Sequence, residues 1–450
     1  MKNSPCALMA FGKNWCRMML LISMVTSWGC RQTQFHAAHL FRATTRPIVA
    51  SPLAVDFDRD GRLEIAVGSL DGHFYLLDDS LCDFRQFSLD NSLEKGRQFY
   101  SSPAAWDIDR DGFPEIFVAS ENGKLWGWKI HDVETTRSDV PRRVAGFPIA
   151  LDGIIRSSPT IVADSLIAIG GSGKMFVFDR QGRAAPGWPQ EINGLAEATA
   201  AWFDDVLAIS TLVPGESSRG YLHAWRLNGT SYPNFPINLK MDSNSSPTLV
   251  DLDGDDRIEI VIGDDAGFLH VFRLDGSELP GFPRLAGDRL ESSPTVSDID
   301  GNGMFDIIIG SADGRIYAWN AVGDALLGWP VKTSDEVYAS IAIADIDGDG
   351  RLEVVAGSRD YRLYAFYAEG TPVPGFPINC GDKILSSPWV GDLDGDGQTD
   401  IVVGADNGIH RIPNLGKLGA CPWPMFRHDL AHTGAVVTPS NKNTPASQAQ

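Results

Sequence analysis

The chain has 450 residues, of which 43% are hydrophobic, and it contains 46 glycines and 27 prolines. This composition can form a large core, and frequent Gly and Pro favour a turn-rich β protein over a helical one. The formal net charge of −20 argues against a nucleic-acid partner, because phosphates are bound by Lys and Arg.

The N-terminus has the pattern of an export signal. Basic residues precede the apolar stretch MMLLISMVTSWGC, which has the length of a signal-peptide core and is too short to span a bilayer. Cys30 directly follows a small residue, so it could carry a lipid. We expect residues 1–30 to be a signal peptide or a lipoprotein leader. The mature chain would then be exported, as a secreted, periplasmic or cell-surface protein that contacts the membrane only through a lipid anchor at Cys30.

The rest of the chain is built from a repeat. Eight units open on a Ser-Pro pair or a variant of it, and the last five begin 47 to 48 residues apart. The opening pairs are Ser51-Pro52, Ser102-Pro103, Ser158-Pro159, Ala198-Thr199, Ser246-Pro247, Ser293-Pro294, Ser340-Ile341 and Ser387-Pro388. We therefore expect one repeat domain at 47–434, an N-terminal segment at 31–46 and a disordered polar tail at 435–450.

Each unit has the pattern of four short strands. A β-type run such as SPTVSDID leads into an acidic loop, an apolar run such as DIIIGS, a turn, and the alternating run RIYAWN. One unit cannot bury both faces of so small a sheet, whereas stacked copies can. About four strands per 40–50 residues are typical of a propeller blade. The sequence therefore predicts an all-β fold, a β-propeller of about eight four-stranded blades, or of seven if one degenerate unit is absorbed.

Six units carry the same acidic phrase between their first and second expected strands. In DIDGDGRLEVVAGS, which begins at Asp345, acids stand at positions 1, 3, 5 and 9 and Gly at position 6. Calcium takes about six to eight oxygens, which these carboxylates and the carbonyl of position 7 could supply, with position 9 binding through both oxygens. An EF-hand fails on spacing, because its last acid stands at position 12 between two helices. A solvated turn would need only one or two such residues.

The phrase predicts about six bound calcium ions. The expected metal ligands, with position 7 contributing only its carbonyl, are Asp56, Asp58, Asp60, Arg62 and Glu64; Asp107, Asp109, Asp111, Phe113 and Glu115; Asp251, Asp253, Asp255, Arg257 and Glu259; Asp298, Asp300, Asn302, Met304 and Asp306; Asp345, Asp347, Asp349, Arg351 and Glu353; and Asp392, Asp394, Asp396, Gln398 and Asp400. Asp256 replaces the glycine of the third phrase, and Asn302 lowers the charge of the fourth, where we expect weaker binding.

The phrase D-x-D-x-D-G-x-x-[D/E], followed by an apolar run and Gly-Ser, resembles FG-GAP/VCBS repeats, as in the propeller head of integrin α chains. The resemblance covers nearly all of the chain after the leader, and CPWPMFRHDLAHTG (421–434) is similar to the last segment of bacterial members. It implies a calcium-binding propeller of the bacterial exported type, without the later domains of an integrin.

Units three and four lack the acidic loop, since ADSLIAIGG and FDDVLAIST pass directly from the first strand to the second. The six loops should share one face of the propeller. On the other face, the residue three positions before each Pro or its equivalent varies from unit to unit, although loops also vary without any function. A ligand ring could include Tyr100, Arg156, Asn244, Glu291 and Tyr338.

The cysteines outside the leader are Cys82, Cys380 and Cys421, which allow at most one disulfide and leave its pairing open. No CxxC pair is present, so we do not expect thiol-based metal or redox chemistry.

No Gly-x-Ser-x-Gly, HExxH or phosphate-binding loop is present, and we assign no catalytic residue. We expect an exported binding or adhesion module for a protein or a polysaccharide, and favour this over an enzyme. Two enzyme alternatives stay open. Propellers that resemble this one occur among polysaccharide lyases, and quinone-dependent dehydrogenases contain phrases like DGRIYAWN. The calcium phrase in most units argues against the dehydrogenase.

Overall fold

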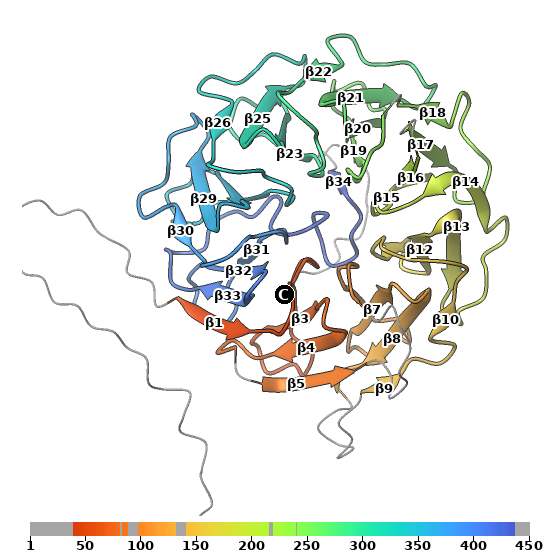
Figure 1. Cartoon of the computed structure of the whole chain (residues 1–450), viewed down its shortest axis with the longest axis horizontal. Helices are drawn as coiled ribbons and strands as arrows, with labels where there is room; N and C mark the ends of the chain where they lie inside the picture. Colours follow the sequence, from red (N-terminus) through yellow and green to blue (C-terminus); the bar gives the residue numbers. More distant parts are fainter. Residues whose placement is uncertain are drawn as a thin grey trace, which may run out of the picture.

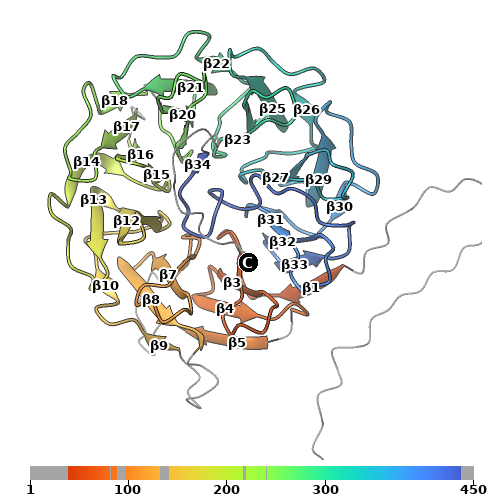
Figure 2. The same cartoon turned by 180° about the vertical axis from the view of Figure 1, so that it is seen from behind.

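The structure is a computed structural model of the chain, and it describes residues 39–81, 83–88, 98–131, 141–215, 219–239 and 241–436. The strands form a ring of small sheets around a central axis (Figure 1), which is also seen from behind (Figure 2). These ranges contain no α-helix, and therefore no helix that could cross a membrane. The predicted all-β propeller is confirmed. The expected leader at 1–30 and residues 437–450 of the expected tail lie outside the described ranges.

The strand bounds follow the units. Units one and two form β2 (Leu53–Val55), β3 (Glu64–Gly68), β4 (His73–Leu77), β5 (Asp83–Ser88), β6 (Ala104–Trp106), β7 (Glu115–Ser120), β8 (Lys124–Lys129), β9 (Arg142–Arg143) and β10 (Ile149–Ala150). Units three and four form β11 (Thr160–Val162), β12 (Leu166–Gly170), β13 (Ser172–Asp179), β14 (Gln190–Leu195), β15 (Ala201–Phe203), β16 (Val206–Val213), β17 (Arg219–Trp225) and β18 (Ile237–Asn238). Units five to seven form β19 (Thr248–Val250), β20 (Glu259–Gly263), β21 (Phe268–Arg273), β22 (Arg284–Leu285), β23 (Thr295–Ser297), β24 (Asp306–Gly310), β25 (Arg315–Asn320), β26 (Val331–Lys332), β27 (Ala342–Ala344), β28 (Glu353–Gly357), β29 (Arg362–Tyr367) and β30 (Ile378–Asn379). Unit eight forms β31 (Trp389–Gly391), β32 (Asp400–Ala405) and β33 (Gly408–Ile412), and β1 (Leu40–Ala43) and β34 (Ala435–Val436) flank the repeats.

Within each unit the strands pair antiparallel in chain order, with the first strand nearest the axis (Figure 1). The described strands form seven hydrogen-bonded sheets. One of them has eight strands and joins units three and four, because β14 pairs with β16 at Leu195 and Leu212. The sequence leaves eight and seven blades open. The ring has eight blades if this sheet is counted as two, and seven if it is counted as one.

The Ser-Pro phrase links each unit to the next. The N–H of Ser51 donates to Oγ of Ser102 at 2.9 Å, and the same bond recurs at the following junctions, except that among the described residues none joins Ser293 to Ser340. It closes the circle where the N–H of Ser387 donates to Ser51 Oγ at 3.0 Å. We call these residues the hydroxyl ring: Ser51, Ser102, Ser158, Thr199, Ser246, Ser293, Ser340 and Ser387. Ser or Thr recurs at this position because its hydroxyl satisfies a buried amide of the preceding unit.

The N-terminal strand β1 completes the last sheet. It pairs antiparallel with β33, with Phe41 opposite His410, so one strand from the start of the chain and three from its end share a sheet. At the other end, β34 pairs in parallel with β19. The hydrogen-bonded strands extend from Leu40 to Val436, beyond both bounds of the expected repeat domain at 47–434. β1 and β34 thus pair with strand edges that would otherwise stay open.

The closing segment, residues 421–436, runs along the inside of the ring (Figure 1). Its carbonyl groups accept hydrogen bonds from first strands of six units, donated by the N–H groups of Ile343, Val390, Ala105, Ile161, Trp202 and Leu249. Arg427 and His432 are buried, and His432 Nδ1 lies 3.0 Å from the carbonyl oxygen of Pro159. The segment thus joins the inner strands through backbone hydrogen bonds.

The apolar core lies between neighbouring blades. Trp128 of unit two packs against Phe74 of unit one, with ring centroids 5.5 Å apart. Trp225 of unit four packs against Trp188 of unit three at 5.7 Å. Each blade therefore buries its faces against its neighbours, as stacked repeats must.

Candidate metal centres

The six acidic phrases form the loops between the first and second strands of their units. Position 9 is the first residue of the second strand in every case: Glu64, Glu115, Glu259, Asp306, Glu353 and Asp400. The strand therefore fixes the last acid in place relative to the loop. Units three and four have short turns there, residues 163–165 and 204–205.

Three hydrogen bonds recur in all six loops. The N–H of position 6 donates to the acid at position 1, that of position 7 to the side chain at position 5, and that of position 2 to the acid at position 9. In the loop 345–353 these bonds measure 3.0, 2.8 and 2.8 Å. The acid at position 1 accepts through both oxygens in most loops, as Asp345 does from Gly348 and Gly350, whereas position 9 accepts the N–H of position 2 through one oxygen.

The second carboxylate oxygen is often left without a donor. Buried oxygens with no hydrogen-bond partner among the described residues include Asp56 Oδ1, Glu115 Oε1, Glu259 Oε1, Asp306 Oδ1, Glu353 Oε1 and Asp394 Oδ1. Leaving a buried acceptor unsatisfied costs about 1–3 kcal/mol, and more when it is charged. A bound cation would satisfy these oxygens.

The spacing of the oxygens fits calcium. One carboxylate oxygen from each of Asp56, Asp58 and Glu64 lies within 4.8 Å of the other two. The first three acids of the loops at 107 and 251 form equivalent groups. Oxygens bound to one calcium ion at about 2.4 Å lie no more than about 4.8 Å apart, so each group lies within the span of one calcium shell. At position 9 one oxygen accepts the N–H of position 2. The other has no hydrogen-bond partner among the described residues in Glu115, Glu259, Asp306 and Glu353, whereas in Asp400 it accepts from Arg411.

The electrostatics of the loops also favour a cation. Burial raises the pKa of Glu353 to about 8, and the nearby Asp345, Asp347 and Asp349 add repulsion, against the lowering effect of the Ile346 N–H. The same causes raise the pKa of Glu64, Glu115, Glu259 and Asp306 to about 7. A divalent ion at the loop would oppose this repulsion and favour the ionised carboxylates.

The third loop keeps its shape despite losing its glycine. Position 6 has a positive φ in all the loops, such as 88° at Gly350, and Asp256 adopts the same conformation with φ 63°. Its N–H still donates to Asp251 Oδ2 at 3.0 Å. Asp is among the non-glycine residues that adopt a positive φ most readily, so the loop backbone keeps its conformation without the glycine.

Two loops contain a cation supplied by the chain. Lys129 Nζ hydrogen-bonds Asp109 and lies 3.0 Å from Asp111 Oδ2 and 3.5 Å from Glu115 Oε1. In the last loop, Arg411 Nη2 lies 2.7 Å from Asp394 Oδ2 and 3.0 Å from Asp400 Oδ2. These side chains approach the same oxygens that a metal ion would bind.

Other third strands also send a side chain to their loop. Arg273 Nη2 lies 3.2 Å from Asp253 Oδ2, and the Tyr367 hydroxyl lies 3.4 Å from Asp347 Oδ2.

Sequence reasoning missed these side chains because it treated each loop alone. Lys129, Arg273 and Tyr367 stand opposite position 9 in the register of the second and third strands. The register of that hairpin could have indicated them.

The expected ligand ring lies in loops that join neighbouring units. Arg156 forms ion pairs with Glu121 at 2.8 Å and Glu197 at 2.7 Å, and its guanidinium lies 4.7 Å from the centroid of the Tyr100 ring. The structure therefore brings Tyr100 and Arg156 together.

A second part of the expected ring is connected through Arg289. This guanidinium lies 2.9 Å from Glu291 Oε1 and donates to the Tyr338 hydroxyl at 3.1 Å. Asn244 Oδ1 is buried and has no hydrogen-bond partner among the described residues, and the same holds for Asp265 Oδ1. These loops thus contain polar atoms that have no hydrogen-bond partner among the described residues.

Fold and loops define the class of protein as a β-propeller built from sequence repeats. Residues 298–356 and 345–403 match the model of the FG-GAP-like repeat. This part of the chain therefore consists of FG-GAP-like repeats, and their recognition from the sequence is confirmed. A search of curated proteins finds no match to the chain.

Solved structures with low identity share the fold. A computationally designed protein, Ika8, is 12% identical with a TM-score of 0.59, over 83% of this chain and 98% of its own. A europium-containing methanol dehydrogenase is 12% identical with a TM-score of 0.57, over 83% and 85%. BBS1N, solved in complex with ARL6DN, is 10% identical with a TM-score of 0.50, over 85% and 97%. At this identity the likeness concerns the fold alone.

Proposed function

We propose that the protein is an exported calcium-binding β-propeller that acts as a binding or adhesion module for a protein or a polysaccharide. The observation that carries the calcium part is the recurrence of one preorganised loop in six units. In each loop three hydrogen bonds orient the acids, and buried carboxylate oxygens remain without a donor. Hard oxygen ligands in a flexible loop are what calcium prefers.

Calcium would act here as a structural ion. Each loop connects the strand nearest the axis to the next strand, so an ion that joins positions 1 to 9 would hold these strands together. Exported calcium modules typically bind their ion with dissociation constants of about 10⁻⁴–10⁻³ M, which suits the calcium levels outside cells. The leader expected at residues 1–30 supports export.

The binding part of the proposal concerns the loops that carry Tyr100, Arg156, Asn244, Glu291 and Tyr338. Aromatic and Arg side chains are enriched among the residues that dominate binding energy. The paired Tyr100 and Arg156 offer a ring face and a planar donor group next to two carboxylates. A partner that carries hydroxyl groups, or both positively and negatively charged groups, could form hydrogen bonds with these side chains.

Co-sedimentation of the mature protein with a panel of surface and plant polysaccharides, in calcium and in EDTA, tests the binding function. The proposal predicts calcium-dependent binding to at least one polymer that leaves its length unchanged. The Arg156→Met variant should weaken that binding, whereas Arg183→Met, which removes an exposed guanidinium elsewhere, should not. Binding to none of the polymers would direct the search to a protein partner.

The same assay separates the enzyme alternatives. Shortening of the polymer would show that the protein is a polysaccharide lyase and not a binding module. An absorption spectrum that responds to redox titration would favour a quinone-dependent dehydrogenase. No described side chain is assigned to either reaction.

A further inference from the structure

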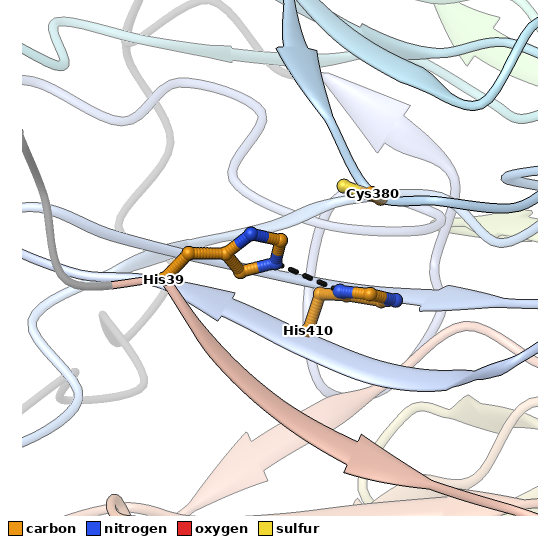
Figure 3. A group of neighbouring side chains, drawn as sticks. All are labelled: His39, Cys380 and His410. Carbon is orange, nitrogen blue, oxygen red and sulfur yellow. Dashed lines mark hydrogen bonds between the residues drawn. The ribbon is translucent and has the colours of Figure 1, made fainter. Parts of the chain in front are cut away.

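A second type of candidate metal site lies where the ring closes. His39, Cys380 and His410 each place one ligand atom within 4.8 Å of the other two (Figure 3). His39 Nε2 lies 2.8 Å from His410 Nδ1. None of these residues belongs to an acidic loop, and the set offers nitrogen and sulfur where the loops offer oxygen.

The three residues come from distant parts of the chain. His39 immediately precedes β1, His410 lies on β33, and Cys380 directly follows β30 of the neighbouring sheet. β1 pairs with β33, which brings His39 beside His410. The group therefore connects the N-terminal strand, the last unit and the unit before it.

Asn407 orients the histidine for a metal. Its Nδ2 donates to the carbonyl oxygen of Cys380 at 3.0 Å, which leaves its Oδ1 to accept from His410 Nε2 at 2.8 Å. His410 Nε2 must then carry the proton, so Nδ1 presents a lone pair toward His39. Metal-binding histidines are typically held in this way, with the second ring nitrogen donating to a neighbouring acceptor.

Two members of the group are buried and the third is exposed. Cys380 and His410 are both 2% exposed, whereas His39 lies at the surface. An ion could enter when the His39 side chain swings outward and be enclosed when it returns. A neutral imidazole is the ligand form that binds a metal ion.

We infer that His39, Cys380 and His410 form a binding site for a thiophilic ion of the zinc class, with water as the fourth ligand, that ties the N-terminal strand to the ring. Two nitrogens bound to one tetrahedral Zn²⁺ at about 2.0–2.1 Å lie about 3.3 Å apart, so the imidazoles need to separate by only about 0.5 Å. The Cys380 thiol gives its proton to water as the sulfur binds the ion.

Cobalt is the direct probe, because a thiolate bound to Co²⁺ gives a near-ultraviolet charge-transfer band that carboxylate loops cannot give. Reduced full-length mature protein in saturating calcium is titrated with Co²⁺, and Zn²⁺ is then added. We expect the band to appear with one equivalent of Co²⁺ and to vanish on addition of Zn²⁺. A chain that gives no such band would contradict the inference.

Variants identify the ligands. Cys380→Ser should abolish the band, whereas Cys421→Ser, which removes the other described thiol, should retain it. A band that survives in Cys380→Ser would overturn the assignment. Asn407→Ala should weaken Co²⁺ binding by about 10–100-fold, as is usual when the partner of a metal-binding histidine is removed.

If Cys380→Ser or Asn407→Ala does not fold, His39→Gln still tests the inference, because the His39 side chain is at the surface. This variant should keep the far-ultraviolet circular dichroism of the parent and weaken Co²⁺ binding at least about tenfold. Zn²⁺ should raise the Tm of the parent but not that of His39→Gln. Equal Co²⁺ affinity in both proteins would exclude His39 as a ligand. Calcium binding by the acidic loops is measured separately, so failure of one proposal is distinguishable from failure of the other.

Discussion

Lys129 supplies the second acidic loop with a positive charge. Its ammonium lies at the carboxylates of Asp109, Asp111 and Glu115, so the loop is partly neutralised without a metal ion. A calcium ion at this loop would have to displace the ammonium and then remain close to its charge. The repulsion at about 4 Å amounts to roughly 4 kcal/mol per unit charge near a protein surface before screening by salt.

Replacement of Lys129 by Gln should therefore tighten calcium binding at the second loop. After screening and side-chain rearrangement we expect about a tenfold lower Kd, or about 1.4 kcal/mol. Calcium titration calorimetry of the parent and of Lys129→Gln measures this difference. Lys124→Gln on the same strand makes the same charge change at the other end of β8 and should leave the calcium affinity unaltered. Equal affinities in the Lys129 variant and the parent would show that the ammonium does not compete.

Burial of His223 makes the free energy of unfolding depend on pH. The His223 side chain is buried, stacks on Trp225 with ring centroids 5.2 Å apart, and burial lowers its pKa to about 4. In the unfolded chain this histidine would have a pKa near 6.5. As the pH falls, the unfolded state therefore binds a proton before the folded state does. The free energy of unfolding should decrease below pH 6.5, by at most about 1.4 kcal/mol per pH unit for this group, until about pH 4.

Urea unfolding between pH 7 and pH 4, with calcium present, measures this effect. The His223→Gln variant should lose less stability over that window than the parent, although it starts from a lower value. Parallel curves for His223→Gln and the parent would show that this histidine is not buried in its neutral form.

At the scale of elements, the hydroxyl ring predicts how much each unit depends on its neighbour. Ser51→Ala removes the acceptor for the Ser387 N–H and leaves a buried donor unsatisfied at the closure of the ring. We expect a loss of about 1–3 kcal/mol in the free energy of unfolding, measured with urea in calcium.

Ser340→Ala is the matched control from the same ring. Within the described residues, no amide of the preceding unit donates to the Ser340 hydroxyl, although Ser340 itself donates from its N–H to Ser387. Its replacement should cost less than that of Ser51. A larger loss for Ser340→Ala would contradict the role given to the hydroxyl ring.

The whole ring was largely predictable because its units repeat. The acidic phrase both marks a loop and starts a strand, so Glu353 or Asp306 could be placed at a strand start from the sequence alone. The recurrent Ser-Pro likewise indicated a position with the same neighbours in every unit. The proximity of the carboxylates at positions 1, 3 and 5, as in Asp251, Asp253 and Asp255, followed from their alternation in a short turn.

Features that do not repeat could not be derived from the sequence. β1 carries the short pattern LFRA, which cannot indicate that its partner is β33 at the far end of the chain. The path of the closing segment inside the ring depends on backbone bonds that any residue could form. Cys380 was set aside because no second cysteine lies near it in sequence. Its histidine neighbours, His39 and His410, approach it only after the ring has closed.

The most direct test of the account is the thermal unfolding of the mature protein in calcium, in EDTA and in EDTA followed by excess magnesium. With Kd values of about 10⁻⁴–10⁻³ M, each ion at 10 mM calcium adds about 1.4–2.7 kcal/mol, so several ions together should raise the Tm by about 10 °C or more. Calcium should restore the Tm after EDTA, and magnesium should not, because it requires a tighter octahedral shell. An unchanged Tm in EDTA would contradict the claim that the acidic loops hold structural calcium.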